Sequence, residues 1–246
     1  MPSKTKTDYL IFTRRSIYMQ RIADAVGDGY EYYVCGTVPV GKAAVLVDKF
    51  ATGFELHQSW KQRYRARQKG KSITKLFCYW HDREPATVQF ILLHRPNRNS
   101  DLPKGERWRM ATNRHTRIQS GGYELVRLPN ERTATDSIQP LPRYRWSWRY
   151  NPQRINDFEA DLKRAIVRKS EADYLTLFKR LSATLGFAGA RQQAYGLLKQ
   201  MESDWLKTTG TKPPECFKGK LPTIKRMRNE GILLSQLSVM KQEWAE

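Results

Sequence analysis

The segment from Arg143 to Tyr150 alternates cationic or small residues with aromatic ones, reading Arg-Tyr-Arg-Trp-Ser-Trp-Arg-Tyr. Successive side chains of a β-strand point to opposite faces, so a strand would place the three arginines on one face and the four rings on the other. A helix would mix cations and rings around its whole surface. The alternation therefore predicts a strand with one aromatic face and one guanidinium face.

Two interpretations of this strand are open. Guanidinium groups bind phosphates bidentately and exposed rings stack on bases, so the strand suits a nucleic-acid surface. Alternatively, the rings belong to the hydrophobic core and the arginines are merely solvated. The overall charge favours a binding role for the arginines, which are Arg143, Arg145 and Arg149.

The chain is strongly basic. Its 246 residues include 44 Lys and Arg against 24 Asp and Glu, a formal net charge of +20. Such an excess indicates a polyanionic partner rather than a particular fold. Residues 1–150 hold 27 basic and 13 acidic residues, whereas residues 151–246 hold 17 and 11. We therefore expect the nucleic-acid footprint in the first part of the chain.

Hydrophobic content and cysteine usage restrict the class and the compartment. With 39% hydrophobic residues the chain can bury a core, but no apolar run reaches the length of a membrane span or a secretory signal. Cys35, Cys78 and Cys216 form no disulfide or zinc motif, which is typical of a reducing compartment. We expect a cytoplasmic protein with no membrane partner.

The hydrophobic pattern predicts an α+β protein with a mixed, mostly antiparallel sheet and short helices, followed by a C-terminal helical region. Strands are expected at 8–13, 30–38, 72–80, 86–95, 123–128 and 143–150, and the early helices at 14–26 and 40–50. Later helices are expected at 156–169, capped by Asn156, and at 174–181, 190–207 and 232–244. We expect a basic α/β-sheet domain over 1–151 and a helical domain over 152–246.

A second basic feature lies between Leu56 and His81, where no acidic residue occurs. Cations fall on every second residue within it: Lys61, Arg63, Arg65, Arg67, Lys69 and Lys71. A strand would line them along one edge about 6–7 Å apart, close to the spacing of phosphates in a nucleic-acid strand. A helix would spread them around its circumference. An exposed helix, a basic arm and a finger-like hairpin all remain open, and each predicts nucleic-acid contact.

Two further basic segments are candidate contacts. An irregular loop supplies Lys104, Arg107, Trp108, Arg109, Arg114 and Arg117, with Trp108 as a candidate stacking ring. Near the C-terminus a second segment supplies Lys218, Lys220, Lys225, Arg226 and Arg228.

Catalytic motifs are scarce. The histidines do not form His-x-His or His-x-x-x-His pairs, and no P-loop or Gly-x-Ser-x-Gly elbow occurs, so we expect no metal or cofactor. One enzymatic alternative is a metal-independent endoribonuclease, with His115 as general base and Arg114 and Arg117 holding the phosphate. His81 beside Asp82 is the second candidate base. A histidine in a basic loop more often makes a phosphate contact or no contact at all, so a non-enzymatic role is favoured.

These patterns together predict a nucleic-acid-binding protein whose contacts go mainly to the phosphate backbone of RNA or DNA. We expect a non-catalytic subunit, with protein partners, of a larger nucleoprotein complex such as a mobile-element or RNA-guided assembly. A structural adaptor that binds acidic protein partners is the remaining alternative.

Overall fold

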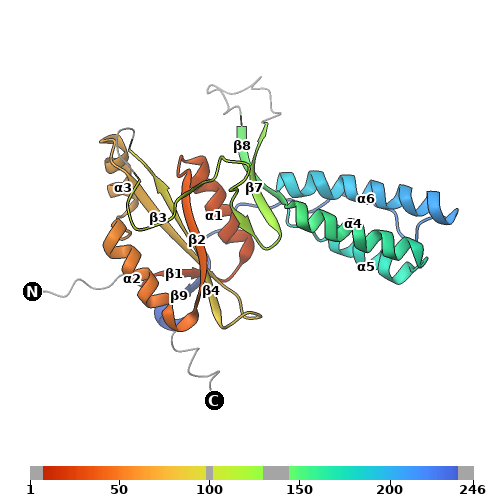
Figure 1. Ribbon diagram of the computed structural model, residues 1–246, viewed down its shortest axis with the longest axis horizontal. Coiled ribbons are helices and arrows are strands. Elements are labelled where there is room, and N and C mark those ends of the chain that lie inside the picture. Colours follow the sequence, from red (N-terminus) through yellow and green to blue (C-terminus); the bar gives the residue numbers. More distant parts are fainter. Residues whose placement is uncertain (1–7, 98–101, 130–143, 238–246) are drawn as a thin grey trace, which may run out of the picture. The chain divides into compact units, whose positions relative to one another are not determined.

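The computed structural model describes residues 8–97, 102–129 and 144–237, and Figure 1 shows its elements. The chain divides into two compact units, Met1–Thr116 with Met227–Glu246, and Arg117–Arg226. This division differs from the boundary at residue 151 that the sequence suggests. The strands around residues 119–150 associate with the helices that follow them, and the segment after residue 226 returns to the first unit.

The first unit is built on a six-stranded sheet with the order β5-β2-β4-β3-β1-β9. Strands β1 and β3 run parallel, and the other neighbouring pairs are antiparallel. The strand bounds are β1 Leu10–Phe12, β2 Tyr32–Pro39, β3 Ile73–Trp80, β4 Thr87–Arg95, β5 Arg109–Met110 and β9 Gly231–Leu233.

Helices cover both faces of this sheet (Figure 1). Their bounds are α1 Arg15–Gly27, the 3-10 turn η1 Val40–Lys42, α2 Ala43–Phe54 and α3 Trp60–Gln68. Because β-strand residues alternate between faces, Tyr79 stacks on Tyr18 of α1 with ring centroids 5.4 Å apart. On the opposite face, Phe90 packs 5.7 Å from Phe50 of α2. The alternating apolar residues thus fill two layers of core.

Strand β9 corrects the sequence prediction of a helix starting at Ile232. Residues 231–233 instead pair antiparallel with β1, and only residues 234–237 of the expected segment are helical; residues 238–244 lie outside the described residues. The pairing needs Gly231, because a Cβ there would collide with the carbonyl oxygen of Ile11. This long-range return closes the sheet edge beside β1.

The second unit combines a three-stranded antiparallel sheet, in the order β6-β7-β8, with three helices. The bounds are β6 Gln119–Ser120, β7 Tyr123–Pro129, β8 Tyr144–Tyr150, α4 Pro152–Val167, α5 Glu171–Ser182 and α6 Ala188–Thr209. Helix α4 begins one turn earlier than predicted. The N-cap is Asn151 and not the expected Asn156: the Asn151 side chain accepts a hydrogen bond from the backbone N–H of Arg154. Pro152 follows in the first turn of the helix.

The alternating segment forms strand β8, as predicted for its described residues, and part of its aromatic face is core. Trp148 and Tyr150 are buried, whereas Tyr144 is 49% exposed. Helix α6 approaches closely at Gly189, where a Cβ would lie 2.8 Å from the carbonyl oxygen of Trp148. For Trp148 and Tyr150, therefore, the core interpretation of the rings is correct.

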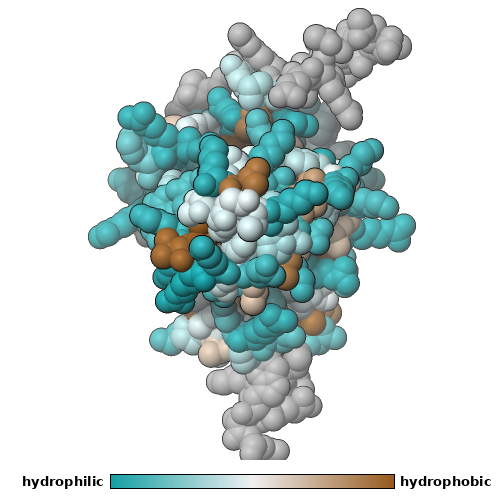
Figure 2. All heavy atoms as spheres, turned by 90° about the vertical axis from the view of Figure 1, so that its right-hand side faces the viewer, coloured by the Kyte–Doolittle hydropathy of each residue, from teal (hydrophilic) through white to brown (hydrophobic). Residues whose placement is uncertain are grey.

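The α+β class is confirmed, with mostly antiparallel sheets and helices. Within the described parts of the chain, none of the helices combines the length and the apolar character needed to cross a bilayer. Figure 2 faces the helical end of the second unit, where hydrophilic side chains predominate and hydrophobic ones are scattered.

Candidate nucleic-acid interface

The cations with two-residue spacing lie on and just beyond an exposed helix. Helix α3 begins at Ser59, which forms a capping box with Gln62. Of the open alternatives, the exposed helix is the one observed, with four of the cations on α3 and two beyond its end: Lys61, Arg63, Arg65, Arg67, Lys69 and Lys71. None of the six forms an ion pair with another described residue, so their positive charge is uncompensated locally.

The same helix carries an exposed aromatic pair. Trp60 and Tyr64 are four residues apart, so they share one face of α3. Their rings stack with centroids 5.8 Å apart and planes 23° apart. The side chains are nevertheless 75% and 51% exposed, because they pack on each other and not on the core. Exposed rings beside cations are what nucleic-acid bases stack on.

A hollow of about 140 Å³ lies between this helix and the sheet, and we call it the cation hollow. Its lining has four cationic side chains and one carboxylate. The lining residues are Asp28, Tyr30, Trp60, Arg63, Tyr64, Arg67, Ile73, Lys75 and Arg95. Three separate elements, α3, β3 and β4, bring the cations together. An anion bound here would meet several charges at once.

Lys75 is the most constrained of these cations. Its ammonium lies 4.4 Å from the centre of the Tyr30 ring and 3.9 Å from a carboxylate oxygen of Asp28. Burial lowers the pKa of Lys75, and the positive charges of Arg63 and Arg67 lower it further, whereas the Asp28 carboxylate opposes the shift. A bound phosphate would relieve the repulsion among these cations.

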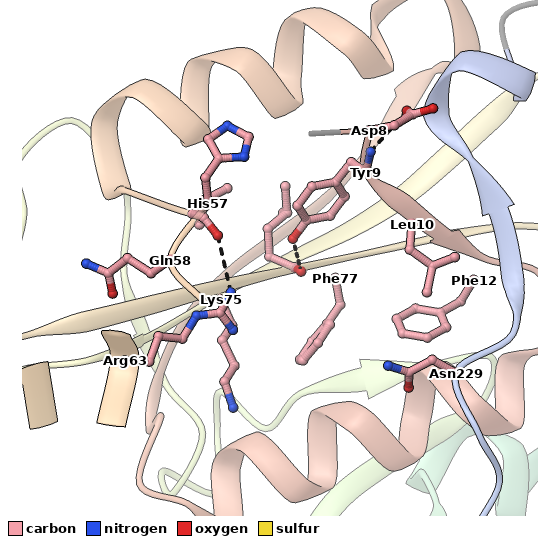
Figure 3. A pocket seen from close by; sticks show the side chains of 12 residues that line it. Asp8, Tyr9, Leu10, Phe12, His57, Gln58, Arg63, Lys75, Phe77 and Asn229 are labelled. Carbon is pink, nitrogen blue, oxygen red and sulfur yellow. Dashed lines mark hydrogen bonds between the residues drawn. The ribbon is translucent and has the colours of Figure 1, made fainter. Parts of the chain in front are cut away.

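Arg63 and Lys75 also line a second hollow of about 300 Å³, which we call the ring pocket (Figure 3). Arg63 donates from Nη2 to the carbonyl oxygen of Leu56 at 3.2 Å, which fixes its guanidinium in the wall. Its Nε is buried without a hydrogen-bond partner among the described residues. The two hollows thus share two cations.

Comparison with protein-family models, with curated proteins and with solved structures finds no match for this chain. In the described residues, no three His, Cys, Asp or Glu side chains converge on a potential metal site. The groups that do converge are guanidinium, ammonium and aromatic, which suit binding of phosphates and bases.

The guanidinium face of β8 is partly paired within its own unit. Arg149 donates from Nε to Oε1 of Glu124 at 2.8 Å, and Arg117 donates to the same oxygen at 2.8 Å. Glu124 is the residue opposite Arg149 in the β7–β8 pairing and is only 4% exposed. Two predicted phosphate ligands are therefore held by a buried carboxylate. Arg145 is exposed, and Arg143 lies outside the described residues.

The predicted contact loop divides in a similar way. Its exposed cations are Lys104, Arg107, Arg109 and Arg114. Trp108, however, is not an exposed stacking ring: it packs edge-on against Phe54, with ring centroids 5.9 Å apart, and lies 5.1 Å from the His94 ring. Its indole nitrogen donates to the carbonyl oxygen of Pro103. Trp108 therefore contributes to the core.

The C-terminal basic segment has no regular secondary structure before β9, and all five of its cations are exposed: Lys218, Lys220, Lys225, Arg226 and Arg228. Arg228 belongs to the first unit and the other four to the second. These residues are not among those lining the cation hollow.

The candidate base His115 is exposed, and Arg114 donates from Nε to its Nε2 at 3.0 Å. One of the two ring nitrogens of His115 thus accepts a hydrogen bond from a neighbouring cation. Arg117, the second arginine expected beside it, is bound to Glu124. His81, the other candidate, lies in the turn after β3, with Nδ1 2.9 Å from an oxygen of Asp82. Neither histidine is among the residues lining the two hollows.

Four contributors to the cation hollow are absent from the sequence-based prediction: Trp60, Tyr64, Lys75 and Arg95. The aromatic pair had a signal in the sequence, because two rings four residues apart share one face of a helix and the rest of α3 is polar or small. Lys75 and Arg95 had none, since each is a single cation within an apolar strand. Only the sheet pairing and the position of α3 bring them together.

Proposed function

We propose that the protein binds nucleic acid through the cation hollow and the exposed face of α3, with most contacts made to phosphates. In this role it serves as a non-catalytic subunit of a nucleoprotein assembly. Phosphates of the bound nucleic acid occupy the cation hollow, and one of its bases stacks on Trp60 or Tyr64.

One observation carries the proposal: Arg63, Arg67, Lys75 and Arg95 surround one hollow that has a single carboxylate, Asp28. Like charges repel, so a fold gathers them only against a cost. At Lys75, burial lowers the pKa most, and the charges of Arg63 and Arg67 lower it further. An anionic ligand offsets that cost. The exposed Trp60–Tyr64 pair at the rim favours a ligand that also has aromatic faces, as a nucleic acid does.

The test removes three charges from the hollow with Arg67→Gln, Lys75→Gln and Arg95→Gln together. Arg63 is left in place because it also lines the ring pocket and holds the carbonyl of Leu56. Arg95 donates to the carbonyl oxygen of Asp28, so urea denaturation checks that the triple variant is folded before binding is compared. We expect affinity for oligonucleotides to fall about tenfold to a hundredfold, and the slope of log K against log salt to flatten by about 0.7 per lost contact on a single strand. Fluorescence anisotropy at several salt concentrations measures both quantities.

The matched control removes three charges elsewhere, with Arg164→Gln, Arg168→Gln and Arg180→Gln on α4 and its C-cap and on α5. These arginines also surround a hollow, but Arg164 and Arg180 are already paired with Asp161. Their loss should change the affinity less than threefold or so, because a paired cation attracts phosphate weakly. Equal losses in both triple variants would contradict the proposed location, and salt-independent association of the wild type would contradict the function.

The lowered pKa of Lys75 leads to a separate prediction about how nucleic-acid affinity depends on pH. Because its pKa is lowered, Lys75 loses its charge at a lower pH than an ordinary lysine. Bound phosphate favours the charged form, so above that pKa binding requires proton uptake, and affinity should fall by up to about tenfold per pH unit. Anisotropy titrations between pH 7 and 10 at constant ionic strength measure the fall. Lys75→Arg, which stays charged, should bind with a flatter pH profile; an unchanged profile would show that Lys75 is not a ligand.

A further inference from the structure

The ring pocket differs in character from the cation hollow beside it. Three rings line the pocket: Tyr9 directly precedes β1, Phe12 ends β1, and Phe77 belongs to the parallel strand β3. The rings of Phe12 and Phe77 lie 6.1 Å apart and are tilted by 56°. The volume of about 300 Å³ is at the lower end of small-molecule sites, about 300–1,000 Å³. Tyr9 packs on the α2 side of the sheet and its hydroxyl donates to the carbonyl oxygen of Leu76, whereas Phe12 also contacts Tyr18 on the α1 side. Phe12 and Phe77 therefore form the apolar wall that suits a flat aromatic group.

Polar groups stand around these rings. Figure 3 shows Asn229 beside Phe12, with Arg63 and Lys75 on another side and His57 and Gln58 above. Asn229 already accepts from Arg21 through Oδ1, and Gln58 donates from Nε2 to Glu55. The amide nitrogen of Asn229 and the amide oxygen of Gln58 can still pair with the edge of a base, and the two cations can hold the phosphate attached to it. The carboxylate in the lining, Asp8, is already engaged by Ser235 and by the backbone of Tyr9. The pocket therefore offers apolar walls, amide groups and two cations, of which Lys75 also lies 3.9 Å from the Asp28 carboxylate.

We propose that the ring pocket takes one unpaired nucleobase of the bound strand, while the adjoining phosphates contact Arg63 and Lys75. The inference rests on the proposed function and adds to it that the bound nucleic acid presents a base outside a duplex. A paired base has its faces stacked and its edge occupied, so it cannot enter a pocket lined on several sides. The shared cations join the pocket to the phosphate path in the cation hollow.

The first experiment varies the ligand and leaves the full-length protein unchanged. Three ligands of equal length are compared by fluorescence anisotropy: a mixed-sequence single strand, an abasic strand with the same phosphates, and a blunt duplex. We expect the single strand to bind about tenfold or more tightly than both others, because each base held by aromatic rings adds to affinity. Equal binding of the single and abasic strands would overturn the pocket while leaving phosphate binding intact. Salt-independent binding, or none, to all three would overturn the proposed function itself.

The second experiment locates the base. A single strand containing 5-bromouracil is crosslinked by ultraviolet light and the modified peptides are identified by mass spectrometry. Crosslinks to Tyr9, Phe12 or Phe77 support the pocket. Crosslinks confined to Trp60 and Tyr64 would overturn it, since they would assign all base contacts to the surface of α3.

A variant completes the test. Phe77→Leu removes a ring that is only half-buried, and Trp60→Leu removes an exposed ring outside the pocket. We expect Phe77→Leu to reduce the preference for the single strand over the abasic strand at least threefold, with abasic-strand affinity unchanged. Trp60→Leu should leave the crosslinks at Tyr9 and Phe12 in place. If Phe77→Leu binds both strands as the wild type does, the pocket is not the base site.

Discussion

Replacing Glu124 by alanine should lower the free energy of unfolding of the Arg117–Arg226 unit by about 3 kcal/mol. The Glu124 side chain is 5% exposed and lies 2.8 Å from Arg117 and 2.7 Å from Arg149. Its removal leaves two guanidinium groups facing each other without a carboxylate. Because these arginines remain 28% and 37% exposed, water partly solvates them, which keeps the loss near the lower end of the range for broken buried pairs.

The measurement is urea denaturation of the full chain, followed by hydrogen exchange of peptides from β7 and β8. Asp161→Ala is the matched control, because Asp161 also lies between two arginines, Arg164 and Arg180, in the same unit. Its side chain is 29% exposed and its partners are more than half exposed, so its loss should cost less than about 1 kcal/mol. Similar losses in both variants would show that burial does not strengthen the Glu124 cluster.

This cluster also shows why the guanidinium face of β8 could be predicted but its role could not. Alternation depends only on neighbouring residues, and along the described residues Tyr144–Tyr150 it correctly predicts a strand and therefore which side chains share a face. The partner of that face is set by strand pairing, which places Glu124 opposite Arg149 across 25 positions of sequence. Net charge gives no sign that a single buried acid takes two of the cations.

The division of the fold has a similar physical basis. Most helices and strands follow local periodicity and turn signals, and those could be expected from the sequence. The unit boundaries depend on long-range contacts, such as the hydrogen bond from the Gly189 backbone to Ser147 Oγ and the pairing of β9 with β1. A change in composition near residue 151 marks the start of helices, not the end of a unit.

In the candidate site, the local part could again be expected and the assembled part could not. The cation run at residues 61–71 predicts a basic surface, and the absence of an apolar face leaves it exposed. Placing Arg63 and Arg67 beside Lys75 and Arg95 requires the end of α3 to lie over β3 and β4. Trp108 was predicted to be an exposed stacking ring but packs against the core. A single ring in a basic loop does not indicate whether it faces solvent or core.

The second large effect is expected at His94, where acid should destabilise the first unit. His94 lies on β4 and is 2% exposed, with Nδ1 2.8 Å from the hydroxyl oxygen of Thr74. Its Nε2 is buried without a hydrogen-bond partner among the described residues. Burial lowers the pKa of His94 to about 4, because the imidazolium form would lose its hydration.

The sign of the pH effect follows from proton binding. Between pH 6.5 and 4 the unfolded chain protonates His94 and the folded chain does not, so stability is full above about pH 6.5 and falls as the pH drops toward 4. The total loss attributable to this residue is about 3 kcal/mol, at 1.36 kcal/mol for each unit of pKa shift. Carboxylates titrate over part of the same range, so only a difference between variants isolates the histidine.

We therefore expect His94→Gln, which keeps a hydrogen-bonding side chain near Thr74 but cannot titrate, to lose less stability than the wild type between pH 7 and pH 4. Urea denaturation at half-unit pH intervals gives the difference in unfolding free energy, which should shift by about 3 kcal/mol in favour of the variant as the pH falls. The same substitution at the exposed His57 is the control for replacing an imidazole by an amide elsewhere in the unit. A profile for His94→Gln parallel to that of the wild type would mean that the folded protein admits a proton at His94.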